Sequence, residues 1–428
     1  MPERRSPLYD YHLRHGGRLI PGGGEFQFPD AYASPADEHV NVRTNVGMQD
    51  LSSMGEVDIK GPGAERLINR LLVNEISDLE PGQVRYSTMC NEDGGNVDDL
   101  TVYKFSDEHF MIVTSSAPRK RAVRWIVEHA LSASAYPTDI TASVALLAVQ
   151  GPRSRDLLRE LVEGVDFDVL RFFRFQAGTI GEVEVLCSRS GYTGELGFEL
   201  YVPAEEVGPV WDTLLARGRE FGMQPYGALA MQSLRIEKAL PLYGRDITEE
   251  LTPFNVGLDR WIRFDKREFI GRDALLRVQE EGIRERFVGL VIESATPADP
   301  DDPVMATGDV AAFRALRLSG SEAGEQVEAL TPGEAIGSIT ASAKGHTVGK
   351  MLALAYVPTT HAFPGARLVV QVAGRPVQAT VSATPFFDPD GSRMRAKVTD
   401  QPQRDVRDSA SAAPAAPRAP RRRRETGR

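Results

Sequence analysis

The sequence predicts an α+β protein with a duplicated, ferredoxin-like body and a small C-terminal β-barrel. A strand, a Gly-Pro turn and an amphipathic helix occur twice in the same order, at Gly61 and at Gly151, 90 residues apart. A different pattern, with apolar residues at every second position, begins near residue 285 and is typical of β-strands. Beyond residue 397 the chain is rich in Arg, Pro and Ala and offers almost no apolar surface to bury. We therefore expect a two-half body at 1–283, a barrel at 284–396 and a disordered tail at 397–428.

The composition restricts the classes of function. The chain has 428 residues, of which 41% are hydrophobic and 26% charged, as expected for a folded protein of two or three domains. A net charge of −10 disfavours binding to nucleic acid or anionic lipid. Neither Cys90 nor Cys187 belongs to a disulfide or zinc pattern, and no apolar run approaches the roughly 20 residues that cross a bilayer. We expect a cytoplasmic protein with reduced thiols and no membrane partner.

The two copies of the repeat read VDIKGPGAERLINRLL and LLAVQGPRSRDLLREL. Leu67 and Leu71 share one face of the first helix, and Leu157 and Leu161 share one face of the second. Each copy continues with hairpin-like strands and a second amphipathic helix, which gives the β-α-β-β-α-β order of the ferredoxin-like unit. Since strand-turn-helix is a common arrangement, a coincidental similarity remains an alternative. Two such units side by side would form a cleft, a frequent place for a ligand.

The C-terminal part has the pattern of a small barrel or sandwich. A charged helix, RVQEEGIRERF, is expected before it, and Val288, Leu290 and Ile292 then alternate with small or polar residues. Further strand-like runs follow at 352–357, 367–372 and 377–381. The segment Pro297–Gly333, rich in Pro, Asp and Ala, is interpreted as a surface insertion.

Paired carboxylates follow a Gly-Gly turn in the segment NEDGGNVDDL. Adjacent strand residues point to opposite faces, so Asp98 shares the apolar face of Leu100 while Asp99 points the other way with Tyr103. A carboxylate on an apolar face requires pairing or hydrogen bonds, which makes Asp98 a candidate acid, base or cation-stabilising group. The alternative is that both carboxylates cap the turn.

A glycine-rich turn precedes a second candidate carboxylate, in the segment SRSGYTGELGFEL. Glycines at such a turn allow the backbone to approach a ligand closely. In the strand that follows, Phe198 and Leu200 take one face, and Glu199 and Tyr201 take the other. Glu199 therefore faces either solvent or a cavity, and in a cavity it could accept two parallel N–H donors from a flat heterocycle.

Motifs of several other enzyme classes are absent from the sequence. It contains no GxxxxGK[ST], no GxGxxG after a strand, no HExxH and no GxSxG, which disfavours nucleotide hydrolysis, zinc proteolysis and serine esterase chemistry. The seven histidines show no pairing at the i, i+4 spacing of a helical metal site. We expect no metal site.

Taken together, these segments resemble the aminomethyltransferase family, represented by the T-protein of the glycine cleavage system. The resemblance runs from about Leu8 to Arg395 and includes NEDGGNVDDLTVYKF, SRSGYTGELGFELYVP, LRIEKALPLYGRDI, LTPFNVGLDRWI and GHTVGKMLALAYVP. Several motifs in the same order are far more specific than any one of them. The resemblance implies a folate-binding α+β body with a terminal barrel, and transfer of a one-carbon unit to tetrahydrofolate, as in glycine catabolism.

The resemblance also implies roles for individual residues. Asp98 matches the catalytic carboxylate beside N5 and N10 of tetrahydrofolate, where it would stabilise the cation that forms as carbon leaves its donor. Glu199 matches the residue that accepts the donor edge of the pteridine. Tyr192, Tyr86 and Met54 match further positions of the folate pocket. A lipoyl carrier protein is the implied carbon-donating partner, and small-molecule folate the implied ligand.

Three departures from the T-protein pattern keep other functions open. Ser53 replaces a histidine, Thr114 replaces an asparagine, and Met231 replaces the arginine that binds the glutamyl carboxylate of folate. The phrases around Lys238, His346 and Arg393 look more like the folate-binding halves of sarcosine and dimethylglycine dehydrogenases. One alternative is therefore a tetrahydrofolate-dependent demethylase of a methylated amine, sulfonium or aryl ether. Another is a non-catalytic folate-binding protein.

Overall fold

The protein is represented by a computed structural model, which describes residues 4–21, 26–131, 133–307 and 332–397. The chain separates into two units, 1–395 and 396–428, and the description below concerns the first. Apart from Lys397, the tail predicted to be disordered lies outside the described residues. The part of the chain that is described holds no helix with the length and apolarity needed to cross a bilayer.

The first half of the body is a five-stranded sheet with two helices. Its elements are β5 (Gly55–Lys60), α3 (Ala64–Leu71), β6 (Val84–Cys90), β7 (Asn96–Ser106), β8 (His109–Thr114), α4 (Arg119–Ala130) and β9 (Tyr136–Asp139). The sheet order is β6-β7-β8-β5-β9. Strands β7, β8, β5 and β9 with the two helices reproduce the predicted ferredoxin-like arrangement, and β6 is an additional edge strand.

The second half repeats this arrangement with one strand inserted. Its elements are β4 (Val46–Asp50), β10 (Val144–Gln150), α5 (Ser154–Leu161), β11 (Phe175–Ile180), β12 (Val183–Ser188), β13 (Gly197–Pro203), α6 (Val207–Gly218), η2 (Arg219–Phe221) and β14 (Met223–Pro225). The order is β11-β12-β13-β10-β4-β14, so β4, which precedes the first half in the chain, lies between β10 and β14. Gly61 and Gly151 have φ values of 122° and 133°, so the two Gly-Pro turns share a conformation that disfavours other residues.

Each sheet packs one face on its own helices, and the two sheets share a further apolar cluster. Trp211 and Leu158 belong to the core of the second half, and Ile68 and Ile126 to that of the first. The shared cluster joins side chains from both sheets: Val84, Tyr103, Met111, Val113, Leu146, Phe175 and Tyr201. This cluster places the strand faces that carry Asp99 and Glu199 toward the same intervening space.

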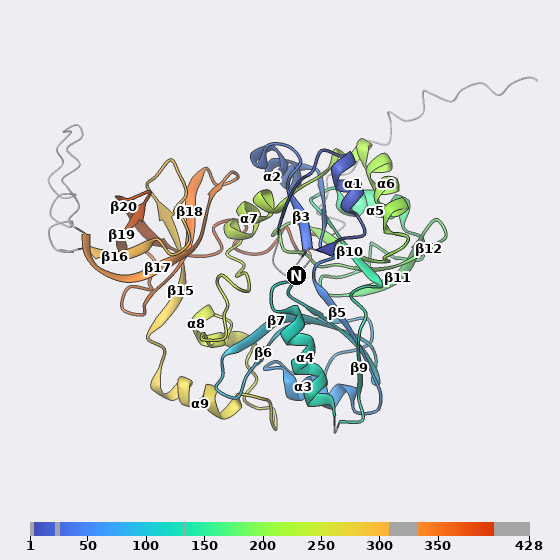
Figure 1. Cartoon of the computed structure of the whole chain (residues 1–428), viewed down its shortest axis with the longest axis horizontal. Helices are drawn as coiled ribbons and strands as arrows, with labels where there is room; N and C mark the ends of the chain where they lie inside the picture. The colour runs from blue at the N-terminus through green and yellow to red at the C-terminus, as the bar shows by residue number, and fades with distance from the viewer. Residues whose placement is uncertain (1–3, 22–25, 132, 308–331, 398–428) are drawn as a thin grey trace, which may run out of the picture. The chain divides into compact units, whose positions relative to one another are not determined.

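The C-terminal part is a closed barrel, visible in Figure 1 as the group of labels β15 to β20. Its strands are β15 (Glu285–Ile292), β16 (Pro303–Thr307), β17 (Pro332–Gly345), β18 (Lys350–Pro358), β19 (Arg367–Val372) and β20 (Arg375–Ser382). Val288, Leu290 and Ile292 are all buried in its core, as their alternation predicts. The barrel order is β15-β18-β17-β16-β19-β20.

Two local predictions were wrong. The charged helix, α9 (Arg272–Glu281), ends before the predicted segment does, because Gly282 has a φ of 79° and Glu285 already begins β15. The interpretation of Pro297–Gly333 as an insertion is wrong at β16, which pairs with β17 and β19. Residues 308–331 of that segment lie outside the described residues, and Pro332 and Gly333 begin β17.

The remaining elements cover the body and connect it to the barrel. They are β1 (Arg4–Arg5), α1 (Tyr9–Arg14), β2 (Arg18–Pro21), β3 (Phe26–Ala31), α2 (Pro35–Thr44), α7 (Ala228–Glu237), α8 (Pro253–Val256) and η3 (Asp259–Trp261). Helix α7 contacts α2 on one side and strands β17 and β18 on the other, which makes it the main link between body and barrel.

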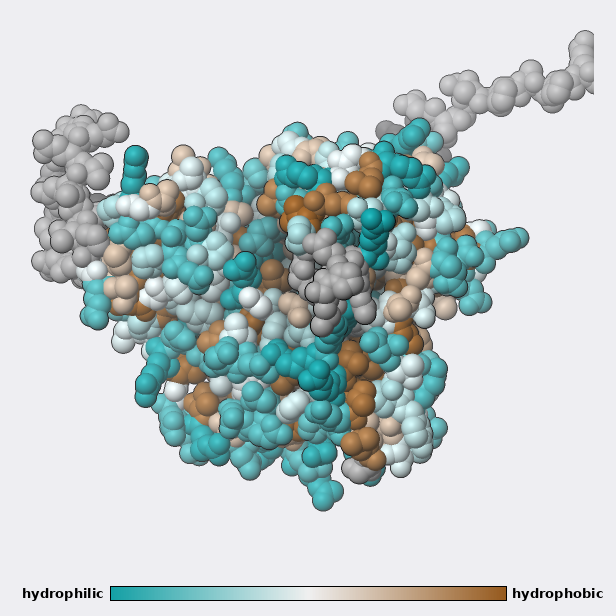
Figure 2. All heavy atoms as spheres, in the orientation of Figure 1, coloured by the Kyte–Doolittle hydropathy of each residue, from teal (hydrophilic) through white to brown (hydrophobic). Residues whose placement is uncertain are grey.

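The visible surface in Figure 2 is mostly polar, with a strip of apolar residues along α4. Val127 of this helix and Leu131, which directly follows it, are exposed, and Leu131 is 87% exposed. Exposed apolar side chains are common on folded proteins, so the strip carries no functional assignment.

Candidate functional site

Asp98 lies near the start of β7, immediately after the Gly-Gly turn. The side chain of Asn91 organises that turn, since its Oδ1 accepts hydrogen bonds from the backbone N–H groups of Asp93 and Gly95. The Asp98 side chain is fully buried, and its Oδ2 accepts a hydrogen bond of 3.0 Å from the backbone N–H of Ser115. Its Oδ1 is also buried and has no partner among the described residues. A buried acceptor without a donor is costly, so this oxygen is suited to a ligand group or cation.

Asp99 points to the opposite face, where two hydroxyl groups hold it. Tyr86 donates from its hydroxyl to Oδ2 at 3.0 Å, and Ser115 donates from its hydroxyl to Oδ1 at 3.3 Å. Ser115 therefore bridges the pair, with its N–H on Asp98 and its hydroxyl on Asp99. The alternative that both carboxylates merely cap the turn does not fit these contacts.

Burial and mutual repulsion make the aspartate pair difficult to ionise. The pKa of Asp98 is raised well above its ordinary value, first by burial and then by the charge of Asp99. Burial also raises the pKa of Asp99 to about 6, against the hydrogen bonds from Tyr86 and Ser115. Such a pair can hold a proton near neutral pH and release it when a positive charge arrives.

Glu199 belongs to β13 and faces the space between the two sheets. Its Oε2 accepts hydrogen bonds from Ser190 at 2.6 Å and from Tyr103 and Tyr201 at 3.5 Å each. The solvent-facing alternative for Glu199 is therefore wrong, because Tyr103 and Tyr201 belong to the shared apolar cluster. Burial raises the pKa of Glu199, and the three hydrogen bonds oppose that rise. Its Oε1 has no donor among the described residues.

The loop 189–197, which precedes β13, passes closely over the side chain of Gln150. A Cβ added at Gly191 would lie 2.0 Å from Oε1 of Gln150, and one at Gly197 would lie 2.3 Å from its Cδ. Gln150 in turn donates to the carbonyls of Ser190 and Phe198. The glycines predicted to permit close backbone approach are thus required by the protein's own packing.

Tyr192 and Met54 lie near the two polar groups described above, the aspartate pair and the network around Glu199. The Tyr192 hydroxyl donates to the carbonyls of Leu240 and Pro241. Burial raises the pKa of Tyr192, with Asp99 among the contributing charges, so Tyr192 is within electrostatic reach of the aspartate pair. Met54 packs against the shared apolar cluster.

The five predicted site residues do not form a single network, and Asp98 lies on the face of β7 that it shares with Leu100, opposite the inter-sheet face of Asp99. Tyr86 is bonded to the aspartate pair, while Glu199 belongs to a separate network with Tyr103 and Tyr201. No direct hydrogen bond joins Asp98 to Glu199 within the described ranges. The assignment of these residues to one site stays a prediction.

Sequence reasoning did not single out Ser115 or the buried ion pair of Arg235 and Asp246. Ser115 donates to Asp98 through its backbone N–H, and because nearly every residue type has this group, the sequence does not reveal the contact. Arg235 and Asp246 are both fully buried, and Asp246 also accepts a hydrogen bond of 2.8 Å from the backbone N–H of Leu242. The one available signal was the arginine between the buried residues Leu234 and Ile236.

The three departures from the T-protein pattern occupy well-packed places. Met231 packs in a cluster with Val42, Tyr226, Ala230 and Leu234. Ser53 shares a hydrogen bond of 2.8 Å with the hydroxyl of Ser116. Thr114 is fully buried, and its hydroxyl has no partner among the described residues. The Met231 side chain carries no charge that could pair with the glutamyl carboxylate of folate.

Two cavities of about 500 Å³ each adjoin the start of α4, and neither is lined by Asp98 or Glu199. The first is lined in part by Ser116, Arg121 and Tyr243. The hydroxyl of Tyr243 donates to the carbonyl of Asn96 at 2.8 Å, so this cavity lies beside the strand end that carries Asp98. The described residues contain no cluster of three or more His, Cys, Asp or Glu side chains arranged to hold a metal ion.

Comparison with known proteins gives matches over most of the chain. Residues 8–266 match the GCVT N-terminal domain, and residues 286–388 match the glycine cleavage T-protein C-terminal barrel domain. An aminomethyltransferase of Moorella thermoacetica is 36% identical over 90% of this chain and 98% of its own length. One of Symbiobacterium thermophilum is also 36% identical, over 90% of this chain and 97% of its own length. The crystal structure of the glycine cleavage system aminomethyltransferase T from Bartonella henselae superimposes with a TM-score of 0.79 at 25% identity, covering 90% of this chain and 98% of that one.

Proposed function

The chain belongs to the glycine cleavage T-protein family, and we propose that it binds tetrahydrofolate through Asp98 and Glu199 and transfers a one-carbon unit to it. Its relatives are named aminomethyltransferases, which are tetrahydrofolate-dependent enzymes. The observation that carries the proposal is the buried Asp98 carboxyl, held at one oxygen by Ser115 and unpartnered at the other.

When bound, tetrahydrofolate would supply the nitrogens, N5 of the pterin ring and the exocyclic N10, that accept the carbon unit. Asp98 would place its unpartnered Oδ1 beside the developing positive charge, where a fixed carboxylate in a dry site is most effective. Ser115 keeps that carboxyl in one orientation through its N–H. Asp99, with its pKa of about 6, can hold or release the proton that Asp98 must lose to become an anion.

Glu199 would orient the flat end of the ligand. Its Oε2 is held by Ser190, Tyr103 and Tyr201, while Oε1 is left without a donor. A carboxylate fixed at one oxygen and open at the other suits an N–H donor edge of a heterocycle. Tyr192 and Met54 would contact the ligand between the two carboxylates. The unpartnered oxygens of Asp98 and Glu199 therefore fit tetrahydrofolate.

The carbon donor is the part of the proposal that separates two candidate functions. In the first, an aminomethyl group arrives on the arm of a lipoyl carrier protein, as in glycine cleavage. In the second, the donor is a methylated amine, sulfonium or aryl ether. The aminomethyltransferase relatives support the first candidate, and the departure from the T-protein pattern at Met231, which packs against Val42 and Leu234, is the observation that keeps the second one open.

Single-turnover assays with the purified full-length chain test the proposal. Formation of methylene-tetrahydrofolate from an aminomethyl lipoyl carrier is expected for the first candidate, and the Asp98→Asn variant should suppress it. Transfer only from methylated donors would establish the second candidate. Tetrahydrofolate binding without transfer from any of these donors would contradict catalysis and favour a folate-binding role.

A further inference from the structure

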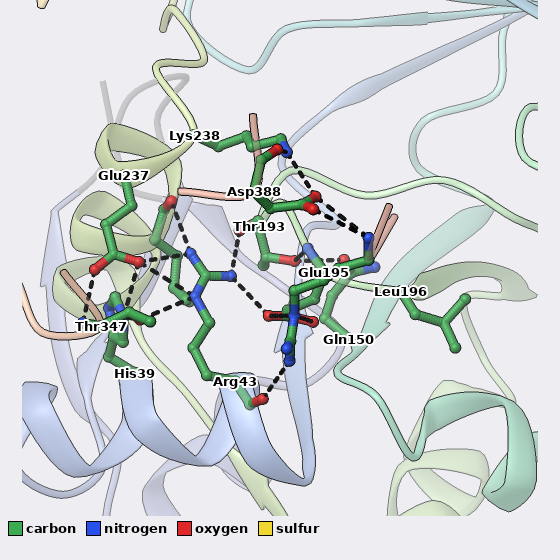
Figure 3. A network of polar contacts seen from close by, with 12 residues as sticks. His39, Arg43, Gln150, Thr193, Glu195, Leu196, Glu237, Lys238, Thr347 and Asp388 are labelled. Carbon is green, nitrogen blue, oxygen red and sulfur yellow. Dashed lines mark hydrogen bonds and ion pairs between the residues drawn. The ribbon is translucent and has the colours of Figure 1, made fainter. Parts of the chain in front are cut away.

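The segment that follows the barrel, Asp388–Arg395, returns to the loop 189–197 of the body. Nε of Arg393 donates to both carboxylate oxygens of Glu195, at 2.8 and 2.9 Å. Nη2 of Arg393 donates to the carbonyl of Arg43 at 2.8 Å. Figure 3 shows the surrounding network, with Glu195 between the Arg43 side and the Asp388 side. The segment after the barrel is thus bonded to the glycine-rich loop near its end.

The same segment also contacts the start of the loop and the end of α7. Nη2 of Arg189 donates to the carbonyl of Met394 at 3.2 Å. The ammonium of Lys238 forms an ion pair of 2.8 Å with Asp388, and both side chains are almost fully buried. Since Arg189 and Glu195 lie at opposite ends of the loop, the segment 388–395 spans it. We call this segment the strap.

Arg43 of α2 holds the loop from the other side. Its Nη1 donates to the carbonyl of Thr193 at 2.7 Å, and its Nη2 forms an ion pair of 2.9 Å with Glu237 (Figure 3). Glu237 accepts a hydrogen bond of 2.7 Å from the backbone N–H of Thr347, in the turn between β17 and β18. The loop is therefore held by groups from both the body and the barrel.

External contacts matter for this loop because its composition gives it little order of its own. It contains Gly191, Gly194 and Gly197, and Gly194 has a φ of 80°. It also carries Ser190, whose hydroxyl donates to Glu199 at 2.6 Å, and Tyr192. Loss of order in the loop would therefore release a hydrogen bond that holds the Glu199 carboxylate.

We infer that Arg393 is a positioning residue, which through Glu195 holds the loop 189–197 in the conformation that binds the folate ligand. The inference rests on the proposed function and adds the strap as a determinant of ligand affinity. The Glu195 carboxylate is 1% exposed, so removing Arg393 leaves a buried charge with weaker compensation from Arg43 at 3.4 Å. Burial raises the pKa of Glu195 and Arg393 opposes that rise, which is consistent with this dependence.

Two readouts on the full-length protein test the inference. Arg393→Met should raise amide hydrogen exchange in residues 189–197 of the ligand-free protein and weaken tetrahydrofolate binding about tenfold, the scale of a lost charge-assisted hydrogen bond. At saturating folate its kcat should stay within about twofold, because Asp98 is untouched. Arg393→Lys should restore part of the affinity, since an ammonium can still bond to Glu195. Arg395→Met is the matched control, because Arg395 lies in the strap but bonds to the carbonyl of Asp390.

A purely structural role for Arg393 makes a different prediction. It would lower the melting temperature and leave the folate dissociation constant of the folded fraction unchanged, which would overturn the inference. Unchanged exchange in the loop of Arg393→Met would overturn it as well. Failure of the wild-type chain to bind tetrahydrofolate would instead contradict the proposed function, and it is recognised from the wild-type titration alone.

Discussion

The backbone N–H of Ser115 donates to Oδ2 of Asp98 at 3.0 Å, while the other oxygen of that carboxyl is buried without a partner among the described residues. Asp98→Asn keeps the shape of the side chain and an acceptor for Ser115, but removes the negative charge. We expect kcat to fall by about 10²-fold or more, the scale of a lost electrostatic stabiliser, with folate affinity within about tenfold. Asp93→Asn, at an exposed position in the preceding turn, is the control. Unchanged turnover in Asp98→Asn would show that Asp98 does not take part in the reaction.

Glu199→Gln tests ligand orientation separately from chemistry. The amide can still accept from Ser190, but it lacks the charge that would strengthen bonds to ligand N–H groups. We expect folate binding to weaken by about tenfold or more, measured as a dissociation constant. Glu184→Gln, at an exposed position on β12, should have no effect. An unaltered dissociation constant for Glu199→Gln would place Glu199 outside the pocket.

The aspartate pair predicts a pH dependence with a defined direction. Burial and then the charge of Asp99 raise the pKa of Asp98, and burial raises the pKa of Asp99 to about 6. Turnover should therefore decline as pH falls through this range, with apparent pKa values that belong to the pair. Asp99→Asn removes the repelling charge, so the acid limb of kcat/KM should move to lower pH. If the acid limb of kcat/KM does not move in Asp99→Asn, groups other than the aspartate pair control the pH dependence.

The network around Glu237 predicts how stability depends on pH. Burial favours a higher pKa for Glu237, but the hydrogen bond from His39 and the charge of Arg43 outweigh it and hold the pKa at about 2. Because this pKa is lower than the ordinary value of 4.5, the stabilisation is complete above that value and is lost as pH falls toward 2.

Unfolding by urea at several acidic pH values measures this effect. The wild-type chain should lose more free energy of unfolding between pH 4.5 and pH 3 than Glu237→Gln does, because the variant has no carboxylate to protonate. Glu160→Gln is the control, since the ion pair of Glu160 with Arg217 is exposed. Equal losses in the wild type and in Glu237→Gln would contradict the lowered pKa.

Much of the fold followed from periodicity in the sequence. The alternation in β7 and β13 correctly separated Leu100 and Leu200, which face helices, from Tyr103 and Tyr201, which face the other sheet. The Gly-Pro turns at Gly61 and Gly151 correctly marked the duplication. These features depend on neighbours in the chain, which is why a single sequence reveals them.

Contacts between distant segments could not be predicted in the same way. The insertion of β4 between β10 and β14 depends on strand pairing across the body, which no local pattern specifies. The pair of Arg393 and Glu195 joins residues 198 positions apart. Both charged residues look like ordinary surface residues in the sequence, and their partnership appears only when the strap is placed beside the loop.

The decisive experiment is isothermal titration of tetrahydrofolate into the full-length chain. We predict saturable binding at one site per chain, weakened in Glu199→Gln and retained in Asp98→Asn despite the loss of turnover. Absence of binding to the folded wild-type protein would contradict the proposed function.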